Sequence, residues 1–423
     1  MATVACDATQ AGVAAAIAAA SPGDVVSIEN APQTATWSSG VTINKALTLR
    51  GVDSATTVIT SATSDLITIS PATDVAVRVT GLGCILGLGQ SRRAITLASP
   101  STTNLTQLRI DHNAISGGSY SIKGENVWVY GVIDHNSFSD NYSPIYLSGD
   151  NDAAWERAYA AGGIVAGSAN ALFIEDNTFT KTAAMNGETI DADIYVQCGA
   201  SVVGRYNTWD TTELTSVNFM TLLLNNHGNM GYYDVVYGPG SGTRGCPIFE
   251  FYHNTVHAGA TTQFIGIRGG SVLIYENAFT ATSSSSRIEF TEEEEWKDEF
   301  FQYHRSAWPA QDQVFNSFIW NNTYNASPIT AITTNGANTV GLWFQENRDY
   351  FMHAPASSGG KCVFTGTRYG GSTTHPTDGD PYAEDTGSME FSASGANAYY
   401  PYTSYTYPHP RTVPLGTPIL TMR

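Results

Sequence analysis

The sequence IDHNAIS at residues 110–116 recurs as IDHNSFS at residues 133–139, and this repeat decides the fold. Further copies are IEDNTFT at 174–180 and IYENAFT at 274–280, with looser copies around Asn207, Asn254, Asn322 and Asn347. The shared asparagine returns after 23 residues at the shortest spacing, and after more where the chain is longer between copies. A repeat of this length is typical of one coil of a parallel β-helix.

The heptad itself explains how such a coil would be built. Apolar residues flank a turn-forming asparagine, which predicts two short strands joined by a tight turn. We expect three short strands per coil, with the Ile and Phe side chains pointing inward and the asparagines stacking from coil to coil, about 4.8 Å apart. A β-sandwich with frequent asparagine turns is the alternative, but it gives no reason to repeat one heptad so often.

The two ends of the chain differ from its middle. Residues 1–24 predict one short helix, because Asp7 and Gln10 form a capping-box pattern before an alanine-rich run. Such a helix would cap the open end of the first coil. Residues 25–350 are expected to form the coils, and residues 351–423 an irregular segment packed along the helix or over its C-terminal end. The whole chain is predicted to be a single domain.

Composition excludes several classes of function. The chain has 423 residues, with 20 Lys+Arg against 38 Asp+Glu, and only 14% of its residues are charged. A nucleic-acid surface needs clustered Lys and Arg, and a membrane span needs about 18 or more consecutive apolar residues, so neither is expected. Residues 1–20 lack the features of a secretory signal. The five cysteines form no CxxC pair, which argues against zinc and leaves disulfides or buried thiols open.

The heptads, the predicted capping helix and the sequence GDVVSI at residues 23–28 resemble the pectate-lyase-like superfamily of β-helix proteins, over roughly residues 5–350. The resemblance implies an all-β fold: a right-handed, single-stranded parallel β-helix with an N-terminal capping helix and long lateral loops. That superfamily includes polysaccharide lyases, glycoside hydrolases, epimerases, phage tailspikes and adhesins. The segments WPAQDQ at 308–313 and DYFMH at 349–353 look like parts of bacterial and phage β-helix proteins.

Three long spacings predict insertions near residues 140–162, 225–247 and 281–313. Insertions on neighbouring coils can wall a groove on a repeat scaffold, so we expect a glycan-binding groove between them. Trp155 and Trp308 lie in the insertions and could stack on sugar rings; anchoring of the loops to the core is the alternative.

The strand expected before Asn207 is IDADIY at residues 190–195, and it supplies the predicted centre of the site. Asp191, Asp193 and Tyr195 would share one face by the period of two. Two carboxylates on one exposed face, about 6.5–7 Å apart, favour a bound cation or acid–base chemistry. We therefore expect Asp191 and Asp193 as metal ligands with Ca²⁺ as the candidate cofactor, and Tyr195 as a substrate contact. Solvated surface carboxylates are the alternative.

Polar residues of the following coils complete the predicted site. Arg268 would lie two coils, about 10 Å, from the aspartates, unless it forms a structural salt bridge with an acidic neighbour. His227 and Tyr233 belong to a long loop beside it, and with Arg268 they are the predicted catalytic residues alongside the aspartates. Asn225 and Arg244 are predicted to bind substrate.

Two mechanisms fit these groups. In a lyase, Arg268, His227 or Tyr233 would remove the proton α to a uronate carboxylate while Ca²⁺ or an arginine neutralises that carboxylate. In an inverting hydrolase, Asp191 and Asp193 would act as acid and base, because that mechanism needs carboxyl groups about 6.5–9.5 Å apart. We prefer the lyase, with the glycoside hydrolase and a non-catalytic glycan-binding or phage tailspike module as alternatives.

The remaining expectations concern partners and setting. The partner is predicted to be a polysaccharide, with no nucleic acid and no membrane. We expect an extracellular or virion-associated protein that is a monomer, or a trimer if it is a tailspike. His112 and His135 occupy equivalent places in adjacent heptads and are predicted to stack in a structural role.

Overall fold

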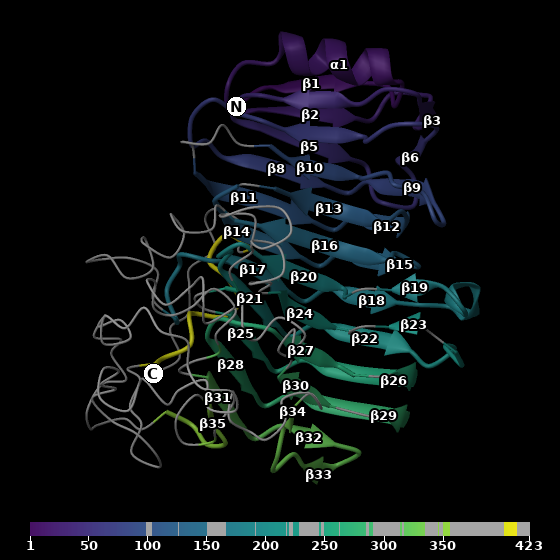
Figure 1. Cartoon of the computed structure of the whole chain (residues 1–423). Helices are drawn as coiled ribbons and strands as arrows, with labels where there is room; N and C mark the ends of the chain where they lie inside the picture. Colours follow the sequence, from purple (N-terminus) through teal and green to yellow (C-terminus); the bar gives the residue numbers. More distant parts are fainter. Residues whose placement is uncertain are drawn as a thin grey trace, which may run out of the picture.

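Short strands stacked coil upon coil make up most of the computed structural model, and Figure 1 shows them descending in steps from the N-terminal helix. The structure describes residues 1–98, 104–125, 127–149, 166–190, 192–216, 218–219, 223–227, 245–246, 249–261, 263–284, 287–290, 314, 317–334, 346, 350–355 and 402–412. Each coil runs through three strands, one in each of three long sheets that we call A, B and C.

The strands of each sheet follow one another in chain order. Sheet A contains β1 (Thr3–Cys6), β2 (Asp24–Ile28), β5 (Leu47–Gly51), β8 (Val77–Thr80), β11 (Leu105–Asp111), β14 (Val129–Asp134), β17 (Leu172–Glu175), β21 (Val202–Arg205), β25 (Phe249–Tyr252), β28 (Val272–Tyr275), β31 (Ser317–Trp320) and β35 (Tyr350–Phe351). Sheet B contains β3 (Thr34–Trp37), β6 (Val58–Ser61), β9 (Gly83–Gly87), β12 (Ala114–Gly117), β15 (Ser137–Ser139), β18 (Thr178–Thr180), β22 (Thr208–Thr211), β26 (Thr255–Thr261), β29 (Ala278–Ser284), β32 (Thr323–Tyr324) and β33 (Ser327–Pro328). Sheet C contains β4 (Val41–Ile43), β7 (Ile67–Ile69), β10 (Ile95–Leu97), β13 (Tyr120–Gly124), β16 (Ser143–Ser148), β20 (Ile194–Gln197), β24 (Leu224–His227), β27 (Ile265–Ile267), β30 (Ile288–Phe290) and β34 (Thr333–Thr334).

The smaller elements lie at the end and at the side of this stack. Helix α1 (Gln10–Ala19) lies across the first coil and buries Val13, Ala16 and Ile17. The two-stranded sheet of β19 (Thr189–Ile190) and β23 (Asn218–Phe219) lies at the side of the stack (Figure 1), and a short 3-10 helix, η1 (Ala183–Met185), precedes β19 in the chain. Pairing within the three main sheets is parallel throughout the described strands, except between β32 and β33. The predicted parallel β-helix is therefore confirmed.

A ladder of buried asparagine side chains runs through the turn between sheets A and B. The amide nitrogen of Asn136 donates to the side-chain oxygen of Asn177 at 3.0 Å, and that oxygen also accepts from the backbone N–H of Asn136 at 3.0 Å. The same pair of bonds links each neighbouring pair in the ladder of Asn113, Asn136, Asn177, Asn207, Asn254, Asn277 and Asn322. The predicted stacking is confirmed for these seven; Asn347 lies outside the described residues.

The residue before each ladder asparagine makes the sharp turn. Its backbone φ lies between 54° and 57° in His112, His135, Asp176, Tyr206, His253, Glu276 and Asn321. This left-handed conformation is uncommon for residues other than glycine, and Asn, Asp and His are enriched in it. The asparagine side chain then fixes the turn by bonding to the coils on either side. A second row of side chains, one per coil, is therefore placed at the surface beside the buried ladder.

Apolar side chains stack inside the coils as the heptads predict. Phe138, Phe179 and Trp209 lie one above another, with ring centroids 5.0 and 4.6 Å apart. Gly204 takes the place that Ile174 has in the preceding coil, because a β-carbon there would lie 2.9 Å from the ring of Phe251. The four cysteines among the described residues are buried free thiols.

The asparagine ladder gives a direct test of stability. Replacing Asn177 by Ala would leave the backbone N–H of Asn136 and the carbonyl of Ile133 without their partners. Because each unpaired buried group costs about 1–3 kcal/mol, we expect Asn177→Ala to lower the free energy of unfolding by about 3–5 kcal/mol. Urea denaturation measures this difference.

The control for that measurement is the next residue. Thr178 is exposed on sheet B, and Thr178→Ala should change the free energy of unfolding by less than about 0.5 kcal/mol. Equal effects of the two substitutions would show that the ladder does not stabilise the coils.

Candidate functional site

Four of the predicted site residues gather on three consecutive strands of sheet C. Tyr195 on β20 stacks on His227 of β24 with a centroid distance of 5.4 Å, and Asn225 pairs with Tyr195 in register. Arg268 directly follows β27, and its backbone N–H donates to the carbonyl of Asn226 at 2.8 Å. Tyr195, Asn225 and Arg268 are buried, and burial together with Arg268 lowers the pKa of His227 to about 3. These residues are therefore close neighbours, and three of the four have buried side chains.

The exposed strand face predicted for Asp193 is wrong. Asp193 is fully buried, and it forms an ion pair of 2.6 Å with Lys181 and accepts a hydrogen bond of 2.9 Å from the indole of Trp209. The strand of sheet C begins only at Ile194, so the alternation that places Tyr195 outward does not extend back to Asp193. At the corner before β20 the aspartate turns inward and is neutralised by a lysine from the corner after β18.

Five predicted site residues lie outside the described residues: Asp191, Trp155, Tyr233, Arg244 and Trp308. The three strand-to-strand connections that were predicted to carry insertions link β16 to β17, β24 to β25 and β30 to β31. All three run from sheet C to sheet A, and most of their residues are among those that the structure does not describe.

The outer face of sheet A carries an open groove of about 1410 Å³. Its floor comes from strands β2 to β11 and includes Thr48, Arg78 and Arg109, so the groove runs along the axis of the coils. His112 and His135 lie at its rim, on the turn to sheet B. The groove is long enough to pass over several coils, and it is lined by arginine, histidine and backbone rather than by apolar side chains alone.

Three acidic side chains stand in register beside this groove. Asp111, Asp134 and Glu175 follow one another on β11, β14 and β17, and all three are fully buried. Each is held by an arginine: Arg78 donates to both oxygens of Asp111, at 2.7 and 2.5 Å, and Arg109 donates to both oxygens of Asp134, at 3.1 and 2.9 Å. These pairs compensate a row of like charges that would otherwise repel one another in a dry environment.

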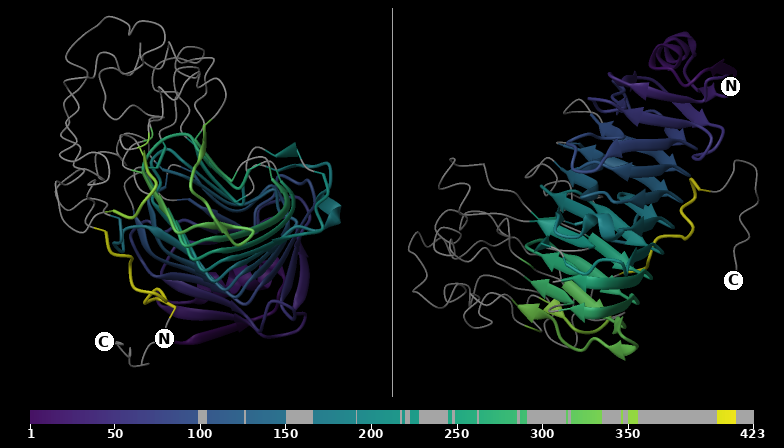
Figure 2. Two further views of the ribbon diagram at one scale, coloured as in Figure 1. Left: turned by 90° about the horizontal axis from the view of Figure 1, so that it is seen from below. Right: turned by 90° about the vertical axis from the view of Figure 1, so that its right-hand side faces the viewer.

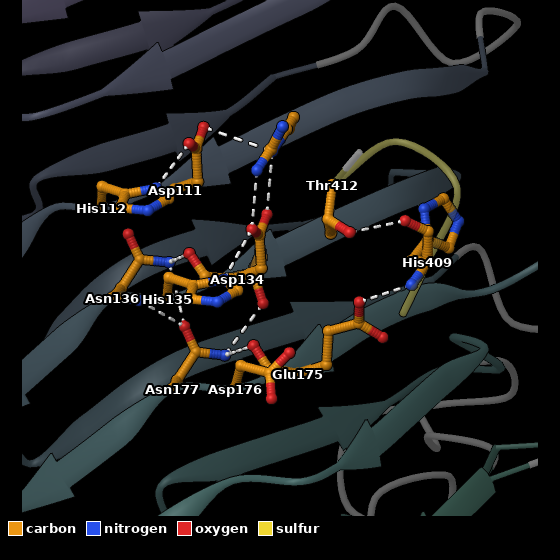
Figure 3. Close-up of polar contacts among 12 residues, drawn as sticks. Asp111, His112, Asp134, His135, Asn136, Glu175, Asp176, Asn177, His409 and Thr412 are labelled. Atoms are coloured by element: carbon orange, nitrogen blue, oxygen red, sulfur yellow. Dashed lines mark hydrogen bonds and ion pairs between the residues drawn. The ribbon is translucent and has the colours of Figure 1, made fainter. Parts of the chain in front are cut away.

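Two of the acids also hold a histidine. Nδ1 of His112 lies 2.8 Å from Asp111, and Nδ1 of His135 lies 3.0 Å from Asp134. The two imidazoles stack with centroids 5.1 Å apart and planes within 2° of parallel, as Figure 3 shows. The predicted stacking of these histidines is confirmed. Their side chains are also about half exposed, at 56% and 47%.

The hydrogen bond to the carboxylate determines which nitrogen of each imidazole carries the hydrogen. An ionised carboxylate only accepts hydrogen bonds, so Nδ1 of each histidine must carry the hydrogen, and a neutral ring then has its lone pair on Nε2. Among the residues that the structure describes, neither Nε2 has a hydrogen-bond partner. Each Asp–His pair therefore presents a base at the rim of the groove.

The charge state of Asp111 follows from two opposed effects. Burial raises the pKa of its carboxyl. The hydrogen bond from Arg78 and the charges of Arg109 and Arg78 lower the pKa by more than burial raises it, so the pKa lies below its ordinary value. The carboxylate is therefore ionised at neutral pH and can orient the imidazole of His112.

The same residues also form a candidate metal-binding cluster. Asp111, His112 and Asp134 offer ligand atoms within 4.8 Å of one another. Calcium takes about 6–8 oxygen ligands, however, and both carboxylates already accept hydrogen bonds from arginines. This cluster therefore does not fit Ca²⁺. The predicted calcium ligand Asp193 does not fit either, because Lys181 neutralises it.

Sequence reasoning did not assign this site, although its signal was present. The dipeptide Asp-His occurs twice in the heptads that define the coils, and the first residue of that dipeptide ends a strand of sheet A. What the sequence does not display is the pairing of Arg78 and Arg109 with these acids, since each arginine lies one coil earlier in the stack.

Comparisons with known proteins add no further assignment: no family model matches the chain, and neither does a curated protein or a solved structure. Within the described part of the chain, no helix has the length and apolar character needed to cross a membrane.

The Arg78–Asp111 pair predicts a specific dependence of stability on pH. Because the folded pKa of Asp111 is lowered, its ionised form stabilises the fold above the unfolded pKa of about 3.9, and this contribution is lost as the pH falls through the folded pKa. We expect the wild type to exceed Asp111→Asn in free energy of unfolding at pH 6, and the difference to shrink below about pH 4.

A second substitution checks the cause. In an Arg78→Met background the hydrogen bond that lowers the pKa is absent, so the pH-dependent part of the difference should become smaller. Urea unfolding at pH 6, 4 and 2.5 measures all four variants. A difference of the same size at every pH would contradict the assignment.

Proposed function

We propose that this chain is a polysaccharide lyase that binds a uronate-containing glycan along the groove of sheet A and cleaves it by β-elimination. The observation that carries the proposal is the repeated Asp–His pair at the rim of a groove whose floor contains arginine. An extended chain of sugars matches the direction of this groove, which runs along the coils rather than across them.

The imidazoles supply the base. Nε2 of His112 or His135 takes the proton from the carbon α to the uronate carboxylate, the bond from the neighbouring carbon to the glycosidic oxygen breaks, and a double bond forms between the two carbons. The leaving oxygen takes up a proton from the protonated imidazole or from water. The buried aspartate stabilises the imidazolium that forms in this step.

The charge of an arginine makes that proton more acidic. Arg78 uses its Nε and one terminal nitrogen on Asp111 while 40% of its side chain stays exposed to the groove. A guanidinium can bind a second carboxylate with its remaining N–H groups, which neutralises the uronate and favours loss of the adjacent proton. Arg50 lies on the neighbouring strand β5, about 4.8 Å along the groove, and is 48% exposed.

Hydrolysis by paired carboxylates is less well supported by the same residues. An inverting hydrolase needs one carboxylic acid and one carboxylate with room for a water between them. Asp111 and Asp134 are both fully buried, and each is held by an arginine. Neither can approach a glycosidic oxygen or a water in the groove.

We also propose the handedness of the coils, the capping role of α1, the setting of the protein and its oligomeric state. We infer a right-handed coil, because parallel crossover connections are right-handed in about 98% of cases. The repeated heptads and their parallel coils support membership of the pectate-lyase-like superfamily. The buried face of α1 supports its role as a cap on the first coil. An extracellular or virion-associated setting and a monomeric state go with a polysaccharide substrate, and a trimer would favour the tailspike alternative.

Elimination can be distinguished from hydrolysis because it creates an unsaturated product. With a panel of uronate polysaccharides, we expect the ultraviolet absorbance of an unsaturated product, at the same rate with added calcium and with a chelator. The double variant His112→Asn/His135→Asn should lower this rate by about 10²-fold or more, because it removes both bases. Asparagine is chosen because it tolerates the left-handed backbone at both positions.

His253→Asn is the matched control. His253 has the same backbone conformation and pairs with Glu276 at 3.2 Å, but it does not line the groove, so its substitution should leave the rate unchanged. Release of sugar without the absorbance would contradict elimination. Binding without release would leave only a glycan-binding module.

A further inference from the structure

The outer face of sheet A is open at one end and covered at the other. Thr48, Arg78, Arg109, Val132 and Phe173 lie in one row, a strand apart. The first three line the groove, whereas Val132 and Phe173 are fully buried although they point away from the interior of the coils. Something must therefore cover the face from β14 onward.

The cover includes residues 402–412, which we call the C-terminal strap. Figure 2 shows it in yellow along the side of the coils. The rings of Tyr405 and His409 lie 5.1 and 4.8 Å from the ring of Phe173, and Tyr407 stacks on Tyr206 at 3.7 Å. The strap thus lies on the same face as the groove and continues its direction.

Successive coils hold the backbone of the strap. Arg205 donates to the carbonyls of Tyr405 and Thr406 at 2.7 and 2.9 Å, and the N–H of His409 donates to Glu175 at 2.8 Å. Arg205 and Glu175 are themselves fully buried and form an ion pair of 2.7 Å. Because these buried charges depend on the strap for hydrogen bonds, this part of it is a fixed element of the fold.

The far end of the strap borders the groove beside the two Asp–His pairs. Arg109 holds Asp134 with two of its nitrogens and the carbonyl of Arg411 with the third, at 2.8 Å. His409, Pro410 and Arg411 line the groove at this point, and Figure 3 shows His409 and Thr412 across from His112 and His135. The side chain of Arg411 is exposed and makes one hydrogen bond, to the carbonyl of Thr106 at 3.1 Å.

We propose that the C-terminal strap forms a closed end of the groove, so that the chain binds the end of a uronate polysaccharide and releases short products of uniform length, with Arg411 contacting the terminal carboxylate. This inference rests on the proposed function. A glycan lying over Arg50 and Arg78 would reach the Asp–His pairs and then meet Pro410 and Arg411. Over sheet A further sugars could not pass, because Tyr405 and His409 of the strap cover the row beyond Arg109. Of the groove residues of later coils, Ser137, Asp176 and Thr178 lie at or beyond the turn to sheet B.

A pair of shortened chains tests the closed end. A chain ending at His409 keeps the contacts to Arg205 and Glu175 but lacks Pro410, Arg411 and Thr412; a chain ending at Thr412 is the matched control. On a polyuronate that the full chain cleaves, we expect short uniform products and a slow fall in viscosity from the full chain and the control. The chain ending at His409 should give products of mixed length and a faster fall in viscosity at equal absorbance.

Arg411→Ala tests the contact without removing the strap. It should raise KM about tenfold on the same substrate and leave kcat unchanged, because the carboxylate contact is made before and during the reaction alike. An unchanged KM would overturn the role of Arg411. Products of one short length from the chain ending at His409 would overturn the closed end, while the elimination itself would stand.

A binding measurement tests the closed end independently of the lyase activity. When polyuronates of defined length are titrated with the double variant His112→Asn/His135→Asn, we expect one bound protein per polyuronate molecule, whatever its length. When the double variant is also truncated after His409, we expect longer polyuronates to bind more protein molecules. This result can be obtained even if no elimination is detected. Stoichiometry that rises with length for the untruncated double variant would overturn the closed end. Thermal unfolding of each variant checks that it is folded.

Discussion

The buried asparagine ladder is the interaction on which the rest of this structure depends. From Asn113 to Asn277, each side chain bonds to the asparagine of the next coil and to a carbonyl of the preceding coil, so it sets both the turn and the vertical spacing. With the turn fixed, the residue before each asparagine must adopt a left-handed backbone and stand at the surface. His112 and His135 are placed at the rim of the groove by this constraint.

The second constraint is electrostatic. A parallel β-helix brings equivalent residues of successive coils within about 4.8 Å, so a repeated acid creates a row of like charges. The chain resolves this in sheet A by giving Asp111, Asp134 and Glu175 one arginine each. Buried ion pairs of this kind add little net stability but are costly to break, by about 3–5 kcal/mol, so they specify one arrangement of the groove. The histidines use the remaining acceptor capacity of two of these acids.

The sequence predicts the coils well because their interactions are repeated. The heptads around Asn113 and Asn177 carry their own strand, turn and interior positions, and the observed strands β12 and β18 follow from them. The site is harder to predict because it depends on corners and on distant residues. Asp193 lies at a corner where alternation has not begun, and its partner Lys181 lies at the other end of the same connection between β18 and β20. No periodicity reveals that Arg411 meets Arg109, which is 302 residues earlier in the chain.

The sequence separation between contacting residues determines the order in which the parts of the molecule can assemble. Contacts between neighbouring coils join residues only 23 to 47 positions apart along the asparagine ladder, so coils can form one after another from the N-terminus. The strap joins residues more than 200 positions apart, since Arg205 bonds to Thr406 and Glu175 to His409. Until residues 402–412 are made, Glu175 and Arg205 lack the hydrogen bonds of the strap and remain accessible to water. The nascent coils then expose these charged side chains beside the apolar side chains of Val132 and Phe173. The strap therefore covers this face of sheet A only after residues 402–412 have been synthesised.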